Sequence, residues 1–346
     1  MRTCFSIRRV LVFVGSLVVL SSGAAIPQTY DYRARSEAPP LEIRSLGGGL
    51  YMTKGEWGAN TGFFVGRDGV LAIDAKTTVK ATRKVVDEIQ KITPKPITRV
   101  VFTHSDPDVF NGRAGYPDGT EVLCSYKTYA EWSYERLFYG GLPVYLEMDA
   151  PASLYQSWPT SSFVPAATFS NQLTIRFGPE EIEFLQLGPA HTSGDIAVCF
   201  LAKKIAFVGD VVFGARDPLI QDFKGGHVYG LVRALSLLLN HRPEITTFIP
   251  SHAEPINREE LKIILKSVEE THTRVMAMVD AGKTLDEVKR AFGVQDPPKD
   301  SSRWRWPSLA LTVYRELTRG RTDRPEQSPA GSASDGEGRQ CEITDR

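Results

Sequence analysis

Runs of apolar residues, separated by Gly, Asp and Pro, divide the chain into short strands and longer helices. The runs Gly62–Gly66 and Val70–Asp74 flank an Arg-Asp-Gly turn, a pattern typical of a β-hairpin. Apolar residues at helical spacing predict a helix from Val79 to Ile92. A fully apolar strand, Val100–Phe102, comes next and leads into a polar loop. The first half of the chain is therefore predicted to run from strands to a helix and back to a strand.

The second half repeats this order of strands followed by helices. After a helix at 127–138, we expect strands at 173–177, 182–187, 196–201, 204–208 and 246–250, and helices at 230–240, 258–280, 284–292 and 307–318. Two such halves indicate an α/β fold, in which each half supplies a mixed sheet covered by helices. The prediction is a four-layer αββα sandwich of two mixed β-sheets flanked by helices.

The two ends of the chain differ from this pattern. Residues 1–25 combine a basic start, an apolar run and small residues, as secretory signal peptides do. The apolar run, Val10–Leu20, is too short to span a bilayer as a helix, so we expect a periplasmic or secreted protein without stable membrane insertion after cleavage. A membrane anchor is the alternative. We assign 26–40 to an N-terminal extension, 41–319 to one domain and 320–346 to a disordered tail.

Composition narrows the possible partners. The chain of 346 residues is 42% hydrophobic, enough for a large core. Without residues 1–25, which carry three arginines and no acid, 38 basic and 41 acidic side chains remain, a net charge of −3. That balance gives no electrostatic basis for binding nucleic acid. The four cysteines show neither a disulfide framework nor metal-site spacing.

Four apolar strands end in loops that carry histidine or carboxylate side chains. These strand-end residues are His104, Asp106 and Asp108 after the strand 100–102, His191 after 182–187, Asp210 after 204–208, and His252 after 246–250. Each could be an ordinary turn, cap or surface residue. Three of the six histidines nevertheless stand at strand ends, and converging imidazole and carboxylate groups are what a divalent metal requires.

These segments resemble the motifs of the metallo-β-lactamase superfamily of metal-dependent hydrolases. The family has a Thr-His-x-His-x-Asp-His loop, a Gly-x-x-His-Thr-x-Gly-Asp loop, a strand-end Asp and a late His. The resemblance runs from about Leu41 to Ala291 and carries the ligand roles over to His104, Asp108, His191, Asp210 and His252. Two positions depart from the family: Asp106 stands where the second histidine is usual, and Val109 where the last histidine of that motif is usual.

The departures change what the resemblance implies about the metal. A first ion would be held by His104, Asp106, His191 and Asp210, and a carboxylate in place of an imidazole shifts the preference toward Fe or Mn, with Zn still suitable. A second ion would have three ligands, Asp108, Asp210 and His252, because Val109 supplies none. We expect one firmly bound divalent ion, zinc first among the candidates, and weak or no binding of a second.

The implied function is hydrolysis by a metal-activated water, with Asp108 as the catalytic residue that orients the water or takes its proton. The substrate would be a small ester, thioester, amide or phosphoester. Two alternatives remain open: a catalytically silent binding protein of the same fold, and a mononuclear iron redox relative. Aromatic residues in and beside the loop 139–165 could line the substrate site or pack in the core; they are Trp132, Phe138, Tyr145 and Trp158.

Overall fold

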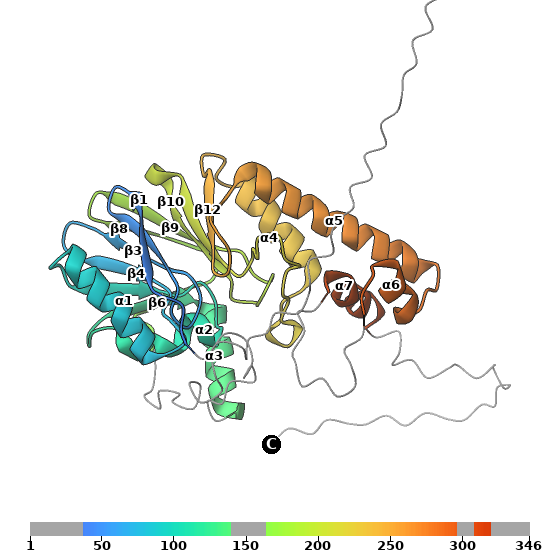
Figure 1. Cartoon of the computed structure of the whole chain (residues 1–346), viewed down its shortest axis with the longest axis horizontal. Helices are drawn as coiled ribbons and strands as arrows, with labels where there is room; N and C mark the ends of the chain where they lie inside the picture. Colours follow the sequence, from blue (N-terminus) through green and yellow to red (C-terminus); the bar gives the residue numbers. More distant parts are fainter. Residues whose placement is uncertain (1–36, 140–163, 296–307, 320–346) are drawn as a thin grey trace, which may run out of the picture.

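Two mixed β-sheets form the centre of the molecule (Figure 1), whose computed structural model describes residues 37–139, 164–295 and 308–319. The first sheet contains, in spatial order, β1 (Glu42–Gly47), β2 (Leu50–Lys54), β3 (Thr61–Val65), β4 (Val70–Ile73), β5 (Ile97–Val101), β6 (Glu121–Ser125) and β7 (Ala167–Phe169). The second contains β13 (Ile256–Asn257), β12 (Thr247–Pro250), β11 (Ile205–Gly209), β10 (Ile196–Phe200), β9 (Glu180–Gln186) and β8 (Gln172–Phe177). Strands β4 to β7 are parallel, as are β11 and β12.

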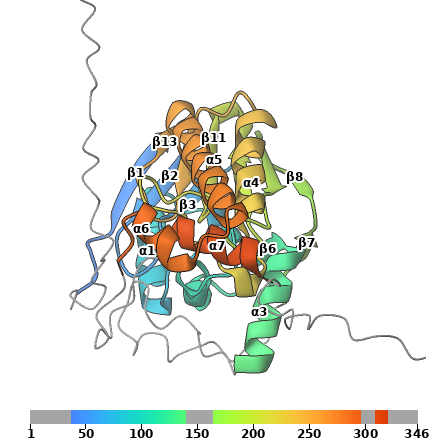
Figure 2. The same cartoon turned by 90° about the vertical axis from the view of Figure 1, so that its right-hand side faces the viewer.

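Helices cover the outer faces of both sheets (Figures 1 and 2). The helices of the described residues are α1 (Val79–Ile92), α2 (Pro107–Phe110), α3 (Tyr126–Tyr139), α4 (Val228–Asn240), α5 (Arg258–Asp280), α6 (Leu285–Ala291) and α7 (Leu309–Thr318). Helix α1 belongs to the first sheet, whereas α4, α5 and α7 pack with the second. Both α5 and α6 begin with a capping box, at Asn257 and Thr284, which satisfies backbone N–H groups of the first turn.

The layers follow from the alternation of side chains along the strands. In β4, Val70 and Ala72 pack toward α1, while Leu71 and Ile73 pack between the two sheets. In β10, Ala197 joins the apolar cluster under α4, and Val198 faces the other sheet. Three apolar clusters therefore separate four layers, and the predicted αββα sandwich is confirmed.

Some elements are absent from the sequence-based prediction. The apolar pattern does not predict β1, β6, β7, β13 or α2. Strand β1 is largely exposed at the sheet edge, β7 has three residues, and β13 has two, so none presents a long apolar run. The expected signal peptide (1–25), the tail (320–346) and most of the N-terminal extension lie outside the described residues.

The aromatic residues near the loop 139–165 are partly accounted for. Trp132 is buried in the apolar cluster between the first sheet and α1, so it is a core residue and not a substrate wall. Tyr145 and Trp158, and the side chain of Phe138, lie outside the described part of the chain.

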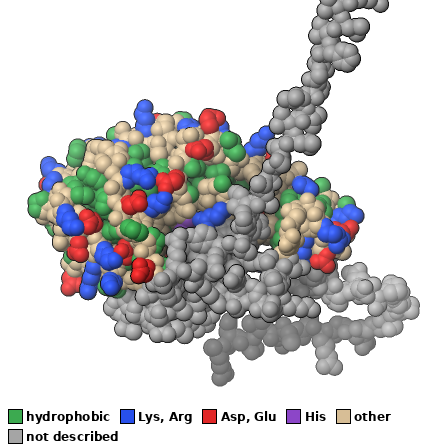
Figure 3. Space-filling view, in the orientation of Figure 1, with side chains coloured by type: hydrophobic (Ala, Val, Ile, Leu, Met, Phe, Trp, Pro, Cys, Tyr) green, Lys and Arg blue, Asp and Glu red, His purple; other side chains and the backbone are tan. Residues whose placement is uncertain are grey.

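The described surface is mixed in charge. Basic and acidic side chains are interspersed over the face shown in Figure 3, in keeping with the near-neutral composition. Among the described residues, no helix combines the length and apolar character needed to cross a membrane.

Candidate metal centre

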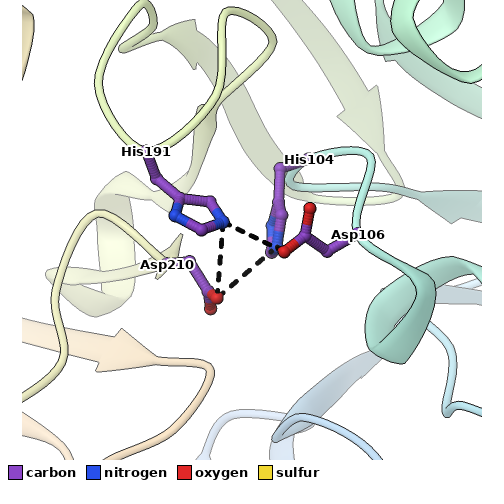
Figure 4. Close-up of side chains that lie close together, drawn as sticks. All are labelled: His104, Asp106, His191 and Asp210. Atoms are coloured by element: carbon purple, nitrogen blue, oxygen red, sulfur yellow. Dashed lines mark hydrogen bonds and ion pairs between the residues drawn. The ribbon is translucent and has the colours of Figure 1, made fainter. Parts of the chain in front are cut away.

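Loops from both sheets bring four of the predicted ligands to one buried point (Figure 4). His104 and Asp106 follow β5, His191 lies between β9 and β10, and Asp210 directly follows β11. One ligand atom from each residue lies within 4.8 Å of the others, and all four side chains are at most 2% exposed. The structure thus brings together four of the six residues predicted as ligands.

The distances within this cluster suit a four-coordinate ion. Asp210 Oδ2 lies 3.7 Å from His104 Nε2 and 3.6 Å from His191 Nε2. Asp106 Oδ2 lies 4.0 and 3.1 Å from the same two nitrogens. Ligands that surround a tetrahedral ion at about 2.1 Å are about 3.4 Å from one another. His104 Nε2 and both Asp210 carboxylate oxygens are buried without a hydrogen bond to any described residue, as expected of metal ligands.

A chain of hydrogen bonds orients His104. The Thr103 hydroxyl donates to Asp74 Oδ2 at 2.8 Å and therefore accepts from His104 Nδ1 at 2.9 Å. Because Nδ1 carries the proton, the lone pair of a neutral His104 lies on Nε2, toward the cluster. Burial raises the pKa of Asp74 to about 7. Gly209 fits closely here, since a Cβ at that position would lie 3.0 Å from the Thr103 hydroxyl.

His191 is oriented in a comparable way. Its Nδ1 donates to the carbonyl oxygen of Leu219 at 2.8 Å, which directs Nε2 to the cluster. Burial by itself lowers the pKa of His191, but the Asp106 and Asp210 carboxylates outweigh it and raise that pKa to about 10. The carboxylates thus favour positive charge at this point, which a divalent ion would supply.

Two residues that sequence reasoning missed contact Asp106. Lys224 Nζ donates to Asp106 Oδ1 at 2.9 Å, and Gln221 Nε2 donates to Oδ2 at 2.5 Å. Burial raises the pKa of Asp106, but Lys224 and His191 more than compensate and hold it well below its usual value. Neither residue follows a strand, so no pattern in the sequence marked them. His227, a histidine of the same loop, instead caps α4 by accepting from Gly230 N at 2.8 Å.

The other two predicted ligands form a pair beside the cluster. His252 Nε2 lies 2.9 Å from Asp108 Oδ2 and 3.5 Å from Asp210 Oδ2. Asp210 therefore adjoins both groups, as a bridging ligand would. Val109 is fully buried in the apolar cluster between the first sheet and α1, so its side chain belongs to the core. The second position thus offers three ligands.

An open cleft with a volume of about 480 Å³ reaches His252 from the surface. Its walls include Trp57, Asn60 and Arg216. Asn60 Nδ2 donates to the carbonyl oxygens of Pro250 and Ala253, and Arg216 donates to that of His252 at 3.0 Å. These bonds fix the His252 loop, and His252 is the one predicted ligand that lines this cleft.

Sequence comparison finds that the chain is similar to an alkylsulfatase and to an O-demethylase subunit. It is 22% identical over 250 residues to a linear primary-alkylsulfatase from Pseudomonas sp., and the matched region covers 64% of this chain and 47% of that protein. It is 22% identical over 251 residues to the 2,4-dinitroanisole O-demethylase subunit alpha from Nocardioides sp., 71% of this chain and 69% of that subunit. The chain therefore spans about half the length of the alkylsulfatase.

Solved structures give the same fold. A stereoselective inverting sec-alkylsulfatase from Pseudomonas sp. matches with a TM-score of 0.65 at 18% identity, covering 80% of this chain and 50% of that one. A metallo-β-lactamase from Pontibacter korlensis matches with a TM-score of 0.53 at 17% identity, covering 66% and 99%. The family model of the metallo-β-lactamase superfamily matches residues 55–252, more than half of the chain and all six predicted ligands. The chain belongs to the metallo-β-lactamase superfamily.

Proposed function

We propose that this protein is an exported metal-dependent hydrolase that cleaves a small-molecule ester with water. The observation that carries the proposal is the buried cluster of His104, Asp106, His191 and Asp210, whose donor atoms suit one divalent ion. Zinc is the first candidate, with iron and manganese as alternatives. Export is supported by the signal-like pattern of residues 1–25.

The residues around the cluster have distinct tasks in such a reaction. A divalent ion held by His104, Asp106, His191 and Asp210 would supply a water whose pKa is lowered to about 7, and would polarise the ester oxygen. Asp108 contacts His252, which in turn approaches Asp210 of the cluster, and we assign Asp108 the task of accepting the proton of the attacking water. As the new bond to the acyl, sulfuryl or phosphoryl centre forms, the bond to the alcohol oxygen breaks, and the proton passes on to that oxygen.

The substrate class follows from the cleft and the relatives. The open cleft at His252 admits a small molecule. Carboxylic esters, thioesters, amides and phosphoesters all fit the chemistry, and the alkylsulfatase relatives add sulfate esters. We place sulfate and carboxylic esters of simple alcohols first.

A panel of chromogenic substrates tests the proposal. The zinc-, manganese- and iron-loaded protein is assayed with p-nitrophenyl acetate, sulfate and phosphate and with a chromogenic β-lactam. We expect turnover of at least one ester that requires metal and disappears in His191→Ala. Activity that survives in His191→Ala would contradict the site assignment. A protein that binds no metal would indicate a silent binding protein, and stoichiometric iron without hydrolysis would indicate a redox relative.

A further inference from the structure

The carboxylate that replaces a family histidine is paired with a buried lysine. Asp106 occupies the place of the second histidine in the family motif, and Lys224 Nζ lies 2.9 Å from its Oδ1 atom. The two side chains are 2% and 3% exposed. Lys224 also donates to the Ser105 hydroxyl at 3.0 Å. The change from histidine to Asp106 at this position is thus accompanied by a positively charged partner, Lys224, from a distant segment of the chain.

The segment that carries Lys224 is docked onto the loop that carries His191. Gln221 N donates to the carbonyl oxygen of His191, and Ser193 N donates to that of Lys224, both at 2.9 Å. A Cβ at Gly226 would lie 2.1 Å from the carbonyl oxygen of His191, so this approach requires glycine. The backbone therefore fixes Lys224 in place, and its contact with Asp106 does not depend on a mobile loop.

The two oxygens of Asp106 have different partners. Oδ1 accepts from Lys224, whereas Oδ2 faces His191 at 3.1 Å and accepts from Gln221 at 2.5 Å. In this arrangement one oxygen is reserved for the ammonium group, and the other is turned to the cluster. Asp106 would therefore offer an ion one oxygen, as an imidazole offers one nitrogen.

The net charge of the Asp106–Lys224 pair also matches that of a histidine ligand. A neutral imidazole contributes no charge, and a carboxylate contributes one negative charge, which is costly to bury without a partner. Asp106 and Lys224 together contribute none. Glu131, an acidic residue nearby, accepts a hydrogen bond from the Ser193 hydroxyl. Burial raises the pKa of Glu131 although Ser193 and the charge of Lys224 lower it, so its carboxyl group takes up a proton more readily than an exposed one.

We propose that Asp106 and Lys224 act as one electrically neutral unit that replaces a histidine ligand, with Lys224 as the positioning residue. This rests on the metal binding proposed above. The consequence is that the site keeps the charge of a set of three imidazoles and one carboxylate. Its preference for zinc is retained, instead of shifting to the harder ions that a bare second carboxylate would favour.

A four-member cycle of zinc dissociation constants tests the pairing. The wild type, Asp106→His, Lys224→Met and the double variant are titrated in competition with a chromogenic chelator. Asp106→His should raise the dissociation constant by about tenfold or more, because the positive charge of Lys224 stays beside the ion without the carboxylate. Lys224→Met should lower it, because the carboxylate charge is no longer compensated. The double variant, with a neutral imidazole and no lysine, should bind within about threefold of wild type. A double variant that binds zinc as weakly as Asp106→His would overturn the proposal.

The metal preference provides a second readout. Lys224→Met releases Oδ1 for bidentate binding and adds net negative charge. The ratio of the manganese to the zinc dissociation constant should therefore fall by at least about tenfold. Lys224→Arg, which keeps the charge, should restore the preference. Lys224→Gln keeps a hydrogen-bond donor without the charge and should behave like Lys224→Met. Wild-type preference in Lys224→Gln would overturn the role of the charge.

A control and a metal-free measurement complete the test. Lys203 pairs with Glu180 at 2.6 Å in a largely buried place away from the cluster, so Lys203→Met should leave zinc binding unchanged. In metal-free protein, the effects of Asp106→Asn and Lys224→Met on the melting temperature should be strongly non-additive, and additive effects would overturn the pairing. A wild type that binds no zinc would overturn the proposed function as well, whereas zinc binding by the wild type, with a double variant as weak as Asp106→His, would overturn the neutral unit alone.

Discussion

His252 Nε2 and Asp108 Oδ2 are 2.9 Å apart, so two side chains that could ligate a second ion contact each other directly. His252 also approaches Asp210 Oδ2 at 3.5 Å. The pair therefore joins the four-ligand cluster through Asp210. This relationship places Asp108 beside His252 on the Asp210 side of the cluster, where we propose that it accepts the proton of the attacking water.

Replacement of Asp108 separates its catalytic role from metal binding. Asp108→Asn should lower kcat by about 100-fold, because an amide cannot accept the proton of the attacking water. The bound metal should stay at one ion per chain, since the four-ligand cluster is intact. Steady-state kinetics and elemental analysis check both statements. Loss of the ion in Asp108→Asn would show that Asp108 is instead a required ligand.

Val109 was the position at which the family motif loses its last histidine, and its side chain is packed in the core. Val109→His should therefore leave the metal count at one and lower the free energy of unfolding by about 2 kcal/mol, because it buries a polar ring among apolar side chains. Denaturant titration and elemental analysis measure the two effects. Two bound ions in Val109→His would mean that position 109 can face the second site.

The predicted and the missed features of the fold have a common physical basis. Apolar runs such as 196–201 and 204–208 are buried on both faces and could be read from the sequence, and β10 and β11 occupy them. Strands β1 and β13 lie at sheet edges, where exposure or short length removes that pattern. Their pairing is decided by neighbours far away in the sequence.

The same holds for the site. His104, His191, Asp210 and His252 each follow a strand, so their meeting could be predicted from the topology. Lys224 and Gln221 reach Asp106 from a loop after β11, and only the docking of that loop on the His191 turn brings them in. The spacing of residues along the sequence does not predict such a contact.

An ion pair of the second sheet gives the stability a defined pH dependence. Burial raises the pKa of Glu183, but hydrogen bonds from Arg242 and His241 outweigh it, so the pKa in the folded state lies below the ordinary value of 4.5. Such a carboxylate stabilises the fold above pH 4.5, and the contribution is lost as the pH falls through the folded pKa.

Glu183→Gln should therefore lower the free energy of unfolding by about 2 kcal/mol at pH 7. The difference from wild type should shrink progressively below pH 4.5. Denaturant titrations across this range provide the measurement, with Glu259→Gln on the exposed start of α5 as the control. A difference that is constant with pH would contradict the role of this charge.

Removal of the ion should destabilise the fold. The cluster exists in the folded chain, so metal at about 100 times its dissociation constant should stabilise it by about 2.7 kcal/mol. Calorimetry before and after chelation, and again after zinc is added back, should show the melting temperature fall and recover. Equal melting temperatures in all three states would contradict binding to the native fold.

The most direct test of the account is the metal content of His191→Ala. The wild type, dialysed against buffered zinc, should retain one ion per chain, and His191→Ala should retain less than about a tenth of that. His272→Ala, a change to a histidine on α5, serves as the matched control and should equal wild type. Equal metal content in His191→Ala and wild type would contradict the metal centre on which the proposed function rests.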